Sequence, residues 1–244
     1  MRSSLYYQAL DCIDTARSDP YDGAIPATST TGLLFSKLGI SDVSNPRIMI
    51  GHTFIKCFFH YNKTDCYLIQ NGVYLLNMTD DARKAVASFS APYALVILNP
   101  SKFVEQVNLA CEKRALRLWY DDVEYLTTRK LQEREHDFLT GRYKKHPVFY
   151  KRVDFQAQQE FRFCVQVPYK HISNPIVTNG MEYQIIDSEA KKETYTMDIG
   201  GLESVSCILP VIDVLNYPVI VDTNNNSVSF LREVKYEKIG GQRD

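Results

Sequence analysis

Residues 155–165 read Phe-Gln-Ala-Gln-Gln-Glu-Phe-Arg-Phe-Cys-Val, and we predict that they belong to an extended strand that runs to Val167. Because successive side chains of a strand point to opposite faces, Phe161, Phe163 and Val165 are expected to enter a core. The remaining side chains share the other, polar face: Gln158, Glu160, Arg162 and Cys164. This strand is expected to pair with a strand on each side, so it decides how the sheet is built.

The rest of the chain consists of β-rich runs interrupted by few helices. A hairpin is predicted at 66–76, because Asn71-Gly72 can supply the positive φ angles of a type I′ turn. Helices are predicted at 80–89, with Thr79 or Asp80 as the cap, and from Ser101 onward. Further strands are predicted at 47–61, 93–98 (a buried one), 116–126, 182–186, 194–199, 204–209, 218–222 and 228–236. This order favours an α+β fold of mostly antiparallel mixed sheets with a few helices.

Length and composition favour one domain. The chain has 244 residues, of which 45% are hydrophobic, and this is enough to form one sizeable core. We therefore predict a single domain over residues 1–244, in which a loop at 174–180 allows a small C-terminal β subdomain to begin at about residue 175. The chain has 28 Lys plus Arg and 29 Asp plus Glu, and this balance excludes a histone-like polycation.

The lack of a recognisable targeting signal and the wide spacing of the cysteines favour a cytoplasmic protein. No apolar stretch approaches the roughly 20 residues of a membrane-spanning helix, and the first residues lack the apolar block of a secretory signal. The six cysteines stand far apart, without Cys-x-x-Cys and without a His at ligand spacing. We interpret them as free thiols of a reducing cytosol. We therefore expect neither a metal site nor a membrane partner.

Two resemblances bear on function. Gln158-x-Glu160 resembles the Gln/Glu-x-Glu signature on a late strand of ADP-ribosyltransferases, including the DarT-like enzymes that modify nucleic acid. The order of three further motifs is similar to that of a large family of uncharacterised bacterial proteins. These motifs are an early Ser-Asp-Pro-Tyr-Asp turn at 18–22, a middle Cys-Phe strand at 57–59 and a late Glu160-x-Arg162 strand. The first resemblance implies an ADP-ribosyltransferase-like fold.

The ADP-ribosyltransferase resemblance implies that NAD is a substrate. Loss of nicotinamide passes through an oxocarbenium-like ribose, which the carboxylate of Glu160 would stabilise, while Gln158 would orient the acceptor. Tyr7 and His60 are candidates for NAD contacts. Arg162 would anchor a phosphate or, as we favour, pair with Glu160. Glu160→Gln would abolish transfer and leave folding intact, because an isostere on the polar face removes the charge without opening a cavity.

Charge distribution gives a hint of the acceptor. Residues 129–152 contain eight Lys or Arg and three acids, with Tyr143, Phe149 and Tyr150 interleaved. Basic groups neutralise phosphates and aromatic rings stack on unpaired bases, so this stretch suits single-stranded nucleic acid; the alternative is a solvated helix face. The main hypothesis is a transferase that modifies RNA or DNA as a toxin or anti-phage defence effector, with a neutralising antitoxin-like partner. The alternatives are an NAD glycohydrolase and a non-enzymatic interaction module in which Gln158, Glu160 and Arg162 form a surface.

Overall fold

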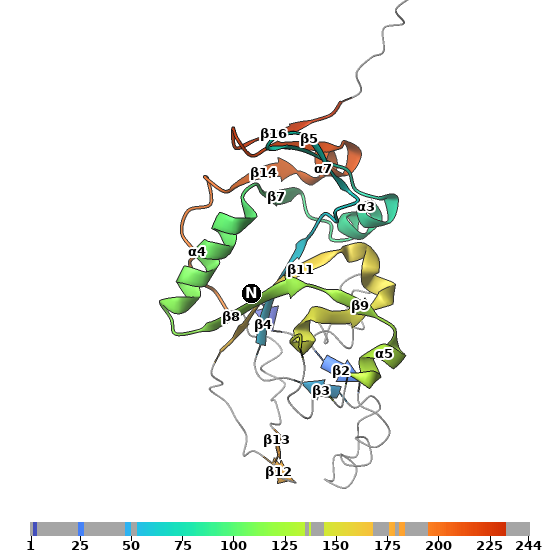
Figure 1. The fold of residues 1–244 in the computed structure, drawn as a ribbon, viewed down its shortest axis with the longest axis vertical. Helices are drawn as coiled ribbons and strands as arrows, with labels where there is room; N and C mark the ends of the chain where they lie inside the picture. The colour runs from blue at the N-terminus through green and yellow to red at the C-terminus, as the bar shows by residue number, and fades with distance from the viewer. Residues whose placement is uncertain are drawn as a thin grey trace, which may run out of the picture. The chain divides into compact units, whose positions relative to one another are not determined.

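The computed structural model describes residues 53–134, 137, 144–167 and 195–232, together with short strands at 2–3, 24–26, 47–49, 176–178 and 181–183 (Figure 1). Helices combine with mostly antiparallel sheets, so the predicted α+β fold is confirmed. The chain divides into two compact units. Unit 1 comprises residues 1–60 and 104–200, and unit 2 comprises residues 61–103 and 201–244.

Unit 1 is built around a four-stranded antiparallel sheet. Its strands follow the order β1 (Arg2–Ser3), β4 (Thr53–Phe59), β11 (Glu160–Gln166) and β8 (Arg117–Asp122). β11 therefore pairs on both sides, as the sequence predicts. Its first residue, Glu160, lies opposite Phe59 of β4, and Arg162 lies opposite both Cys57 and Asp121.

β11 begins later than predicted. Residues Val153–Gln158 form a 3-10 helix, η3, and Gln159 then takes a left-handed conformation with φ 43° and ψ 57°. The predicted strand over 155–159 is therefore wrong, which is consistent with the lack of β-branched residues in Gln156-Ala157-Gln158-Gln159. The carbonyl of Gln159 accepts a hydrogen bond from the backbone N–H of His60 at 2.7 Å, and this bond joins the turn to the end of β4.

Buried side chains lie on both faces of β11, because Phe163 and Cys164 are only 2% and 0% exposed. On one face, Phe163 packs against Phe58 and Tyr120, with ring centroids 5.6 and 5.8 Å apart. On the other face, Cys164 and Ile55 form a core cluster with Val148 and Phe149 of the 3-10 helix η2 (Pro147–Phe149). The side predicted to be the polar face is therefore buried.

Several shorter elements complete the described part of unit 1. They are β9 (Glu124–Leu126), which pairs in parallel with β10 (Tyr150–Arg152), and the helix α5 (Thr128–Glu133), together with the short pairs β2 (Ala24–Pro26) with β3 (Arg47–Met49) and β12 (Ile176–Thr178) with β13 (Met181–Tyr183). Leu131 of α5 is buried against Leu126 and Tyr150. The expected strand at 194–199 is wrong, because residues 195–200 have no regular structure.

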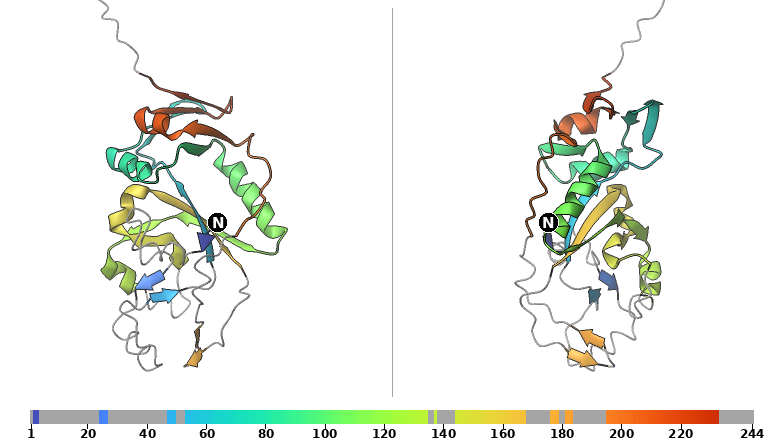
Figure 2. Two further views of the ribbon diagram at one scale, coloured as in Figure 1. Left: turned by 180° about the vertical axis from the view of Figure 1, so that it is seen from behind. Right: turned by 60° about the vertical axis from the view of Figure 1, so that its left-hand side comes forward.

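Unit 2 contains two antiparallel sheets. The larger has the order β16 (Ser227–Phe230), β15 (Val219–Asp222), β6 (Val73–Leu76) and β5 (Cys66–Gln70); the smaller pairs β14 (Ser206–Pro210) with β7 (Tyr93–Ile97). The helices α3 (Asp80–Ala87) and α7 (Val211–Asn216) lie side by side (Figure 2). Arg83 of α3 donates a hydrogen bond to the carbonyl of Leu215. Helix α4 (Pro100–Glu112) begins in unit 2 and continues into unit 1.

Local predictions in unit 2 are partly correct. Thr79 caps α3 by accepting a hydrogen bond from the Ala82 N–H, as predicted. The hairpin of β5 and β6 is present, but among its turn residues only Gly72 has a positive φ, so the turn is not type I′. A register shift between Leu68 and Gln70 accompanies this turn. Strand β7 is not buried, because Tyr93 is largely exposed.

Several predicted features lie outside the described residues. They are Tyr7, the turn at 18–22, most of 135–143, residues 174–175 and 179–180 of the expected boundary loop, and the predicted strand ends at 184–186 and 233–236.

Gly72 generates a stability prediction with a matched control. Its φ is +78°, and a Cβ atom added there would collide with the side chain of Asn224. Gly200 has a similar φ of +84°, but a Cβ atom would meet no other atom within 4 Å. We expect Gly200→Ala to cost about 1–2 kcal/mol for the backbone conformation alone and Gly72→Ala to cost more because of the added clash. Urea unfolding of both variants measures the difference, and equal losses would contradict the steric argument.

Candidate active site around Glu160

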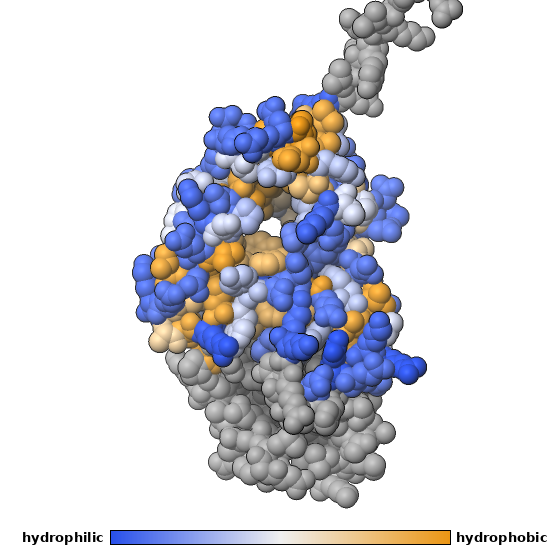
Figure 3. Space-filling model, viewed as in Figure 1, coloured by the Kyte–Doolittle hydropathy of each residue, from blue (hydrophilic) through white to orange (hydrophobic). Residues whose placement is uncertain are grey.

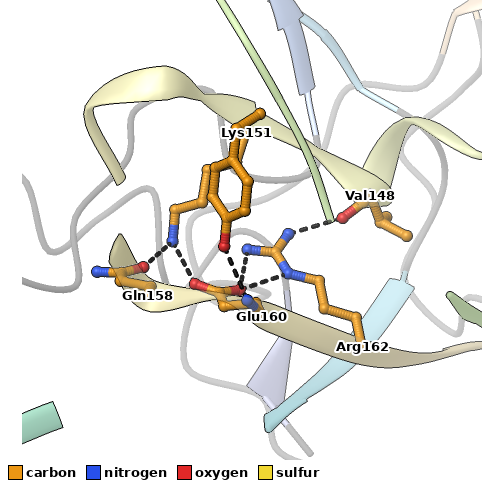
Figure 4. A network of polar contacts seen from close by, with 6 residues as sticks. Val148, Lys151, Gln158, Glu160 and Arg162 are labelled. Carbon is orange, nitrogen blue, oxygen red and sulfur yellow. Dashed lines mark hydrogen bonds and ion pairs between the residues drawn. The ribbon is translucent and has the colours of Figure 1, made fainter. Parts of the chain in front are cut away.

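Glu160 lies between two cationic side chains (Figure 4). Its Oε1 accepts a hydrogen bond from Lys151 Nζ at 2.6 Å. Its Oε2 accepts a hydrogen bond from Arg162 Nε at 2.7 Å and lies 2.6 Å from Arg162 Nη2. The side chains of Lys151, Glu160 and Arg162 are only 2%, 8% and 0% exposed. We call these three residues the charge cluster, and both of its carboxylate oxygens are engaged.

Four elements position the charge cluster. Glu160 and Arg162 are two residues apart on β11, so they share a face. Lys151 comes from β10, and Arg162 Nη1 donates a hydrogen bond to the carbonyl of Val148 in η2 at 2.6 Å. Gln158, the last residue of η3, accepts a second hydrogen bond from Lys151 Nζ at 2.7 Å. The cluster therefore connects η2, β10 and η3 to the start of β11.

The backbone of Glu160 is also held. Its N–H donates to the hydroxyl of Tyr125 at 2.8 Å, and its carbonyl accepts from the Val123 N–H at 2.8 Å. The ammonium group of Lys151 lies 4.8 Å from the centre of the Phe155 ring, which adds a cation–π contact. These contacts fix the position of the carboxylate.

The electrostatics of the cluster favour a permanently charged carboxylate. Burial alone would raise the pKa of Glu160, but the charges of Arg162 and Lys151 outweigh it and lower the pKa to about 2. Burial and the nearby Glu160 charge raise the pKa of Tyr125, so its hydroxyl stays neutral. At neutral pH the cluster holds two positive charges and one negative charge.

This geometry is that of a structural ion-pair network. A carboxylate that stabilises a ribose cation needs an oxygen within reach of the sugar and a charge that is not already balanced. Here Lys151 and Arg162 occupy both oxygens and balance the charge. The expected pairing of Arg162 with Glu160 is confirmed. The polar face is buried and not exposed, and this contradicts the alternative in which Gln158, Glu160 and Arg162 form a surface, because all three side chains are buried.

His60 lies on the opposite face of the sheet from the charge cluster. It follows β4, and its Nδ1 is 2.6 Å from Asp122 Oδ1, with both side chains more than half exposed. Its ring meets that of Phe161 edge-on at 5.9 Å. The structure therefore brings Gln158, Glu160 and Arg162 together but leaves His60 apart from them. Tyr7, the other expected NAD contact, lies outside the described residues.

Two residues of these sites were missed from the sequence. The sequence places Lys151 in the basic stretch. Its contact with Glu160, nine residues later, depends on the 3-10 helix η3 between them, which the sequence does not predict. Asp122 gives no sequence signal of its own. Its position follows from the pairing of β8 with β11, in which Asp122 lies opposite Phe161.

The basic stretch at 129–152 is largely neutralised in its described part. Ion pairs join Lys145 to Asp121 at 3.1 Å, Arg129 to Glu133 at 3.3 Å, Arg152 to Asp154 at 3.7 Å, and Arg134 to Glu124 and Asp137 at 4.0 Å. Lys151 belongs to the charge cluster. Arg142 and Tyr143 lie outside the described residues.

The described residues contain neither a grouped set of metal-ligating side chains nor a membrane-spanning helix. Within the described ranges, no three His, Cys, Asp or Glu side chains are grouped so that they could hold a metal ion, and five described cysteines are free thiols. None of the helices in this part of the chain is long and apolar enough to cross a membrane.

Comparison of the chain with known protein families, with curated proteins and with solved structures gives no match.

The charge cluster predicts a large stability loss for Glu160→Gln. That change leaves two buried cations without a counter-charge, which typically destabilises a protein by about 3–5 kcal/mol. The earlier expectation that folding would stay intact is therefore replaced. The control is Glu133→Gln, which breaks an exposed pair with Arg129 and should cost less than about 0.5 kcal/mol. Urea unfolding monitored by circular dichroism measures both variants.

A second readout keeps this prediction testable if Glu160→Gln unfolds. The triple change Lys151→Met, Glu160→Leu and Arg162→Met replaces every charge by an apolar side chain and should recover most of the lost stability. The pKa of Glu160 is lowered in the folded state, so its contribution is complete above about pH 4.5 and disappears as the pH falls towards 2. The stability gap between wild type and Glu160→Gln should therefore narrow over that range. A gap that is constant with pH would contradict a paired carboxylate.

Proposed function

We propose that this chain is a protein-binding module that pairs an exposed strand edge of unit 2 with an extended segment of a partner. Eleven large hydrophobic side chains of the described residues are exposed, and eight belong to the smaller unit 2. They are Tyr67, Leu68, Ile69, Tyr93, Leu95, Ile208, Ile212 and Leu231. Apolar surface is visible where Figure 1 labels β5, β16 and α7 (Figure 3). Exposed apolar surface of this kind marks interaction sites.

The observation that carries the proposal is strand β5. It is the last strand of the larger sheet, and within the described residues it pairs only with β6. Its consecutive side chains Tyr67, Leu68 and Ile69 are 54%, 64% and 55% exposed. The strand has no charged residue and no proline, two of the devices by which an edge strand avoids pairing; its bulge after Leu68 is a third, which limits the length of any added ladder.

The chemistry of an open edge selects the kind of partner. The outer edge of β5 presents backbone N–H and C=O groups that an extended peptide can pair with, while apolar side chains provide contact area. A folded helix would leave these backbone groups without partners. The proposal therefore names strand addition as the binding mode.

The second candidate is the NAD-dependent mono-ADP-ribosyltransferase acting on nucleic acid as a toxin or defence effector. It is favoured by the position of Glu160 as the first residue of the late strand β11, with Gln158 beside it through Lys151. This function requires Lys151 to leave the carboxylate before a ribose can approach. An NAD glycohydrolase, with water as the acceptor, has the same requirement.

Strand addition is tested with a fluorescent octapeptide of alternating Thr and Val, whose binding is followed by anisotropy. Leu68→Lys should weaken binding at least tenfold, because a charge replaces an apolar contact at the edge. The control is Leu109→Lys, the same substitution at an exposed Leu on α4 in unit 1, which should leave binding unchanged. A peptide with a central Pro should not bind. Absence of binding, or equal binding by both variants, would contradict the proposal.

The enzyme candidates are tested by incubation with labelled NAD and separate pools of RNA, DNA and protein. We expect no labelled macromolecule and no free ADP-ribose, because the charge cluster closes both oxygens of Glu160. Label on a macromolecule would establish the transferase, and free ADP-ribose alone would establish the glycohydrolase. Either result would overturn a purely binding function.

A further inference from the structure

We infer that the extended segment that pairs with β5 is β5 of a second copy of this chain, in an antiparallel pair whose two-fold axis passes beside Leu68. This inference rests on the proposed function and names its partner. Two four-stranded sheets of unit 2 would then form one continuous eight-stranded sheet. Such a pair is isologous, so the same patch must be complementary to itself.

The apolar face of the larger sheet is incomplete at β5. Direct partners across a sheet share a face, and one such row contains Val228, Val221, Tyr74 and Leu68. Val221 is buried, but Leu68 at the end of the row is 64% exposed. A second Leu68 placed beside the first continues the row and covers both side chains. The same chain therefore provides what the edge lacks.

The proposed pairing brings no like charges together, because β5 has no charged residue. An antiparallel pair centred on Leu68 places Tyr67 opposite Ile69 of the other copy, and Cys66 opposite Gln70. The charged residue nearest to the strand is Asp65, which would lie beside the turn residue Asn71 of the other copy. No charge meets a like charge, which is the usual obstacle when a strand edge meets its own copy.

The bulge in β5 limits the strength of the dimer. The register shift between Leu68 and Gln70 bends the strand after Leu68, so the ladder between copies is short. A short ladder buries less than the roughly 1,600 Å² of a standard stable interface. We therefore expect a dissociation constant of order 10–100 µM, with mixed monomer and dimer in that range.

Sedimentation velocity of the full chain over a range of about 1–200 µM tests the inference. Wild type should shift from monomer to dimer with concentration, Leu68→Lys should remain monomeric, and Leu109→Lys should behave as wild type. In a second measurement, Leu68→Cys should form a disulfide-linked dimer under mild oxidation, because the two introduced thiols meet at the axis. Wild type, which retains all native cysteines, provides the background for this crosslink.

The outcomes separate this inference from the proposed function. A wild type that is monomeric throughout but binds the Thr-Val octapeptide overturns the second-copy inference and retains strand addition to another protein. A dimer that Leu68→Lys leaves intact also overturns it, since the contact then lies elsewhere. If Leu68→Lys loses both the dimer and octapeptide binding while Leu109→Lys keeps both, the results support the proposed function and the second-copy inference.

Discussion

The buried contact between one carboxylate and two cations is the constraint on which the rest of unit 1 depends. Glu160 accepts from Lys151 and Arg162, and Arg162 also donates to the carbonyl of Val148. In a low-dielectric interior, each of these charges is tolerated only while the other partners are present. η2, β10 and β11 must therefore come together in one arrangement, and the left-handed Gln159 provides the turn that lets Gln158 reach the same lysine.

The same constraint decides between two interpretations of one sequence motif. A Gln-x-Glu-x-Arg run is compatible with a catalytic carboxylate and with a structural ion pair, because both need Glu160 and Arg162 on one face. Catalytic carboxylates combine a shifted pKa with access to substrate. Here the pKa of Glu160 is lowered by partners that also cover its oxygens. Burial, which alternation along a strand does not reveal, distinguishes the two interpretations.

The sequence predicts local features of this fold better than contacts between distant segments. The Thr79 cap and the hairpin at Gly72 follow from a few neighbouring residues, and the central place of β11 follows from its alternation. Alternation defines two faces but not which one other elements cover, so the polar face was expected in solvent. Lys151 returns to Glu160 only because η3 reverses the chain, and no periodicity predicts that reversal. The pairing of β6 with β15 joins residues more than 140 positions apart, beyond the reach of local patterns.

The charged and the apolar surfaces differ in how many of their groups are still available to bind a partner. Most described basic residues of 129–152 already pair with acids, so a phosphate that binds there would have to replace the carboxylate in each ion pair. The free energy gained from counterion release is then small for each contact.

Among the described residues, Leu68 on β5 has no such competing partner. Covering a side chain of this size contributes about 1.5–3 kcal/mol, and the paired edge adds backbone hydrogen bonds. The open strand of unit 2 therefore offers more binding free energy than the paired basic residues in the described part of 129–152.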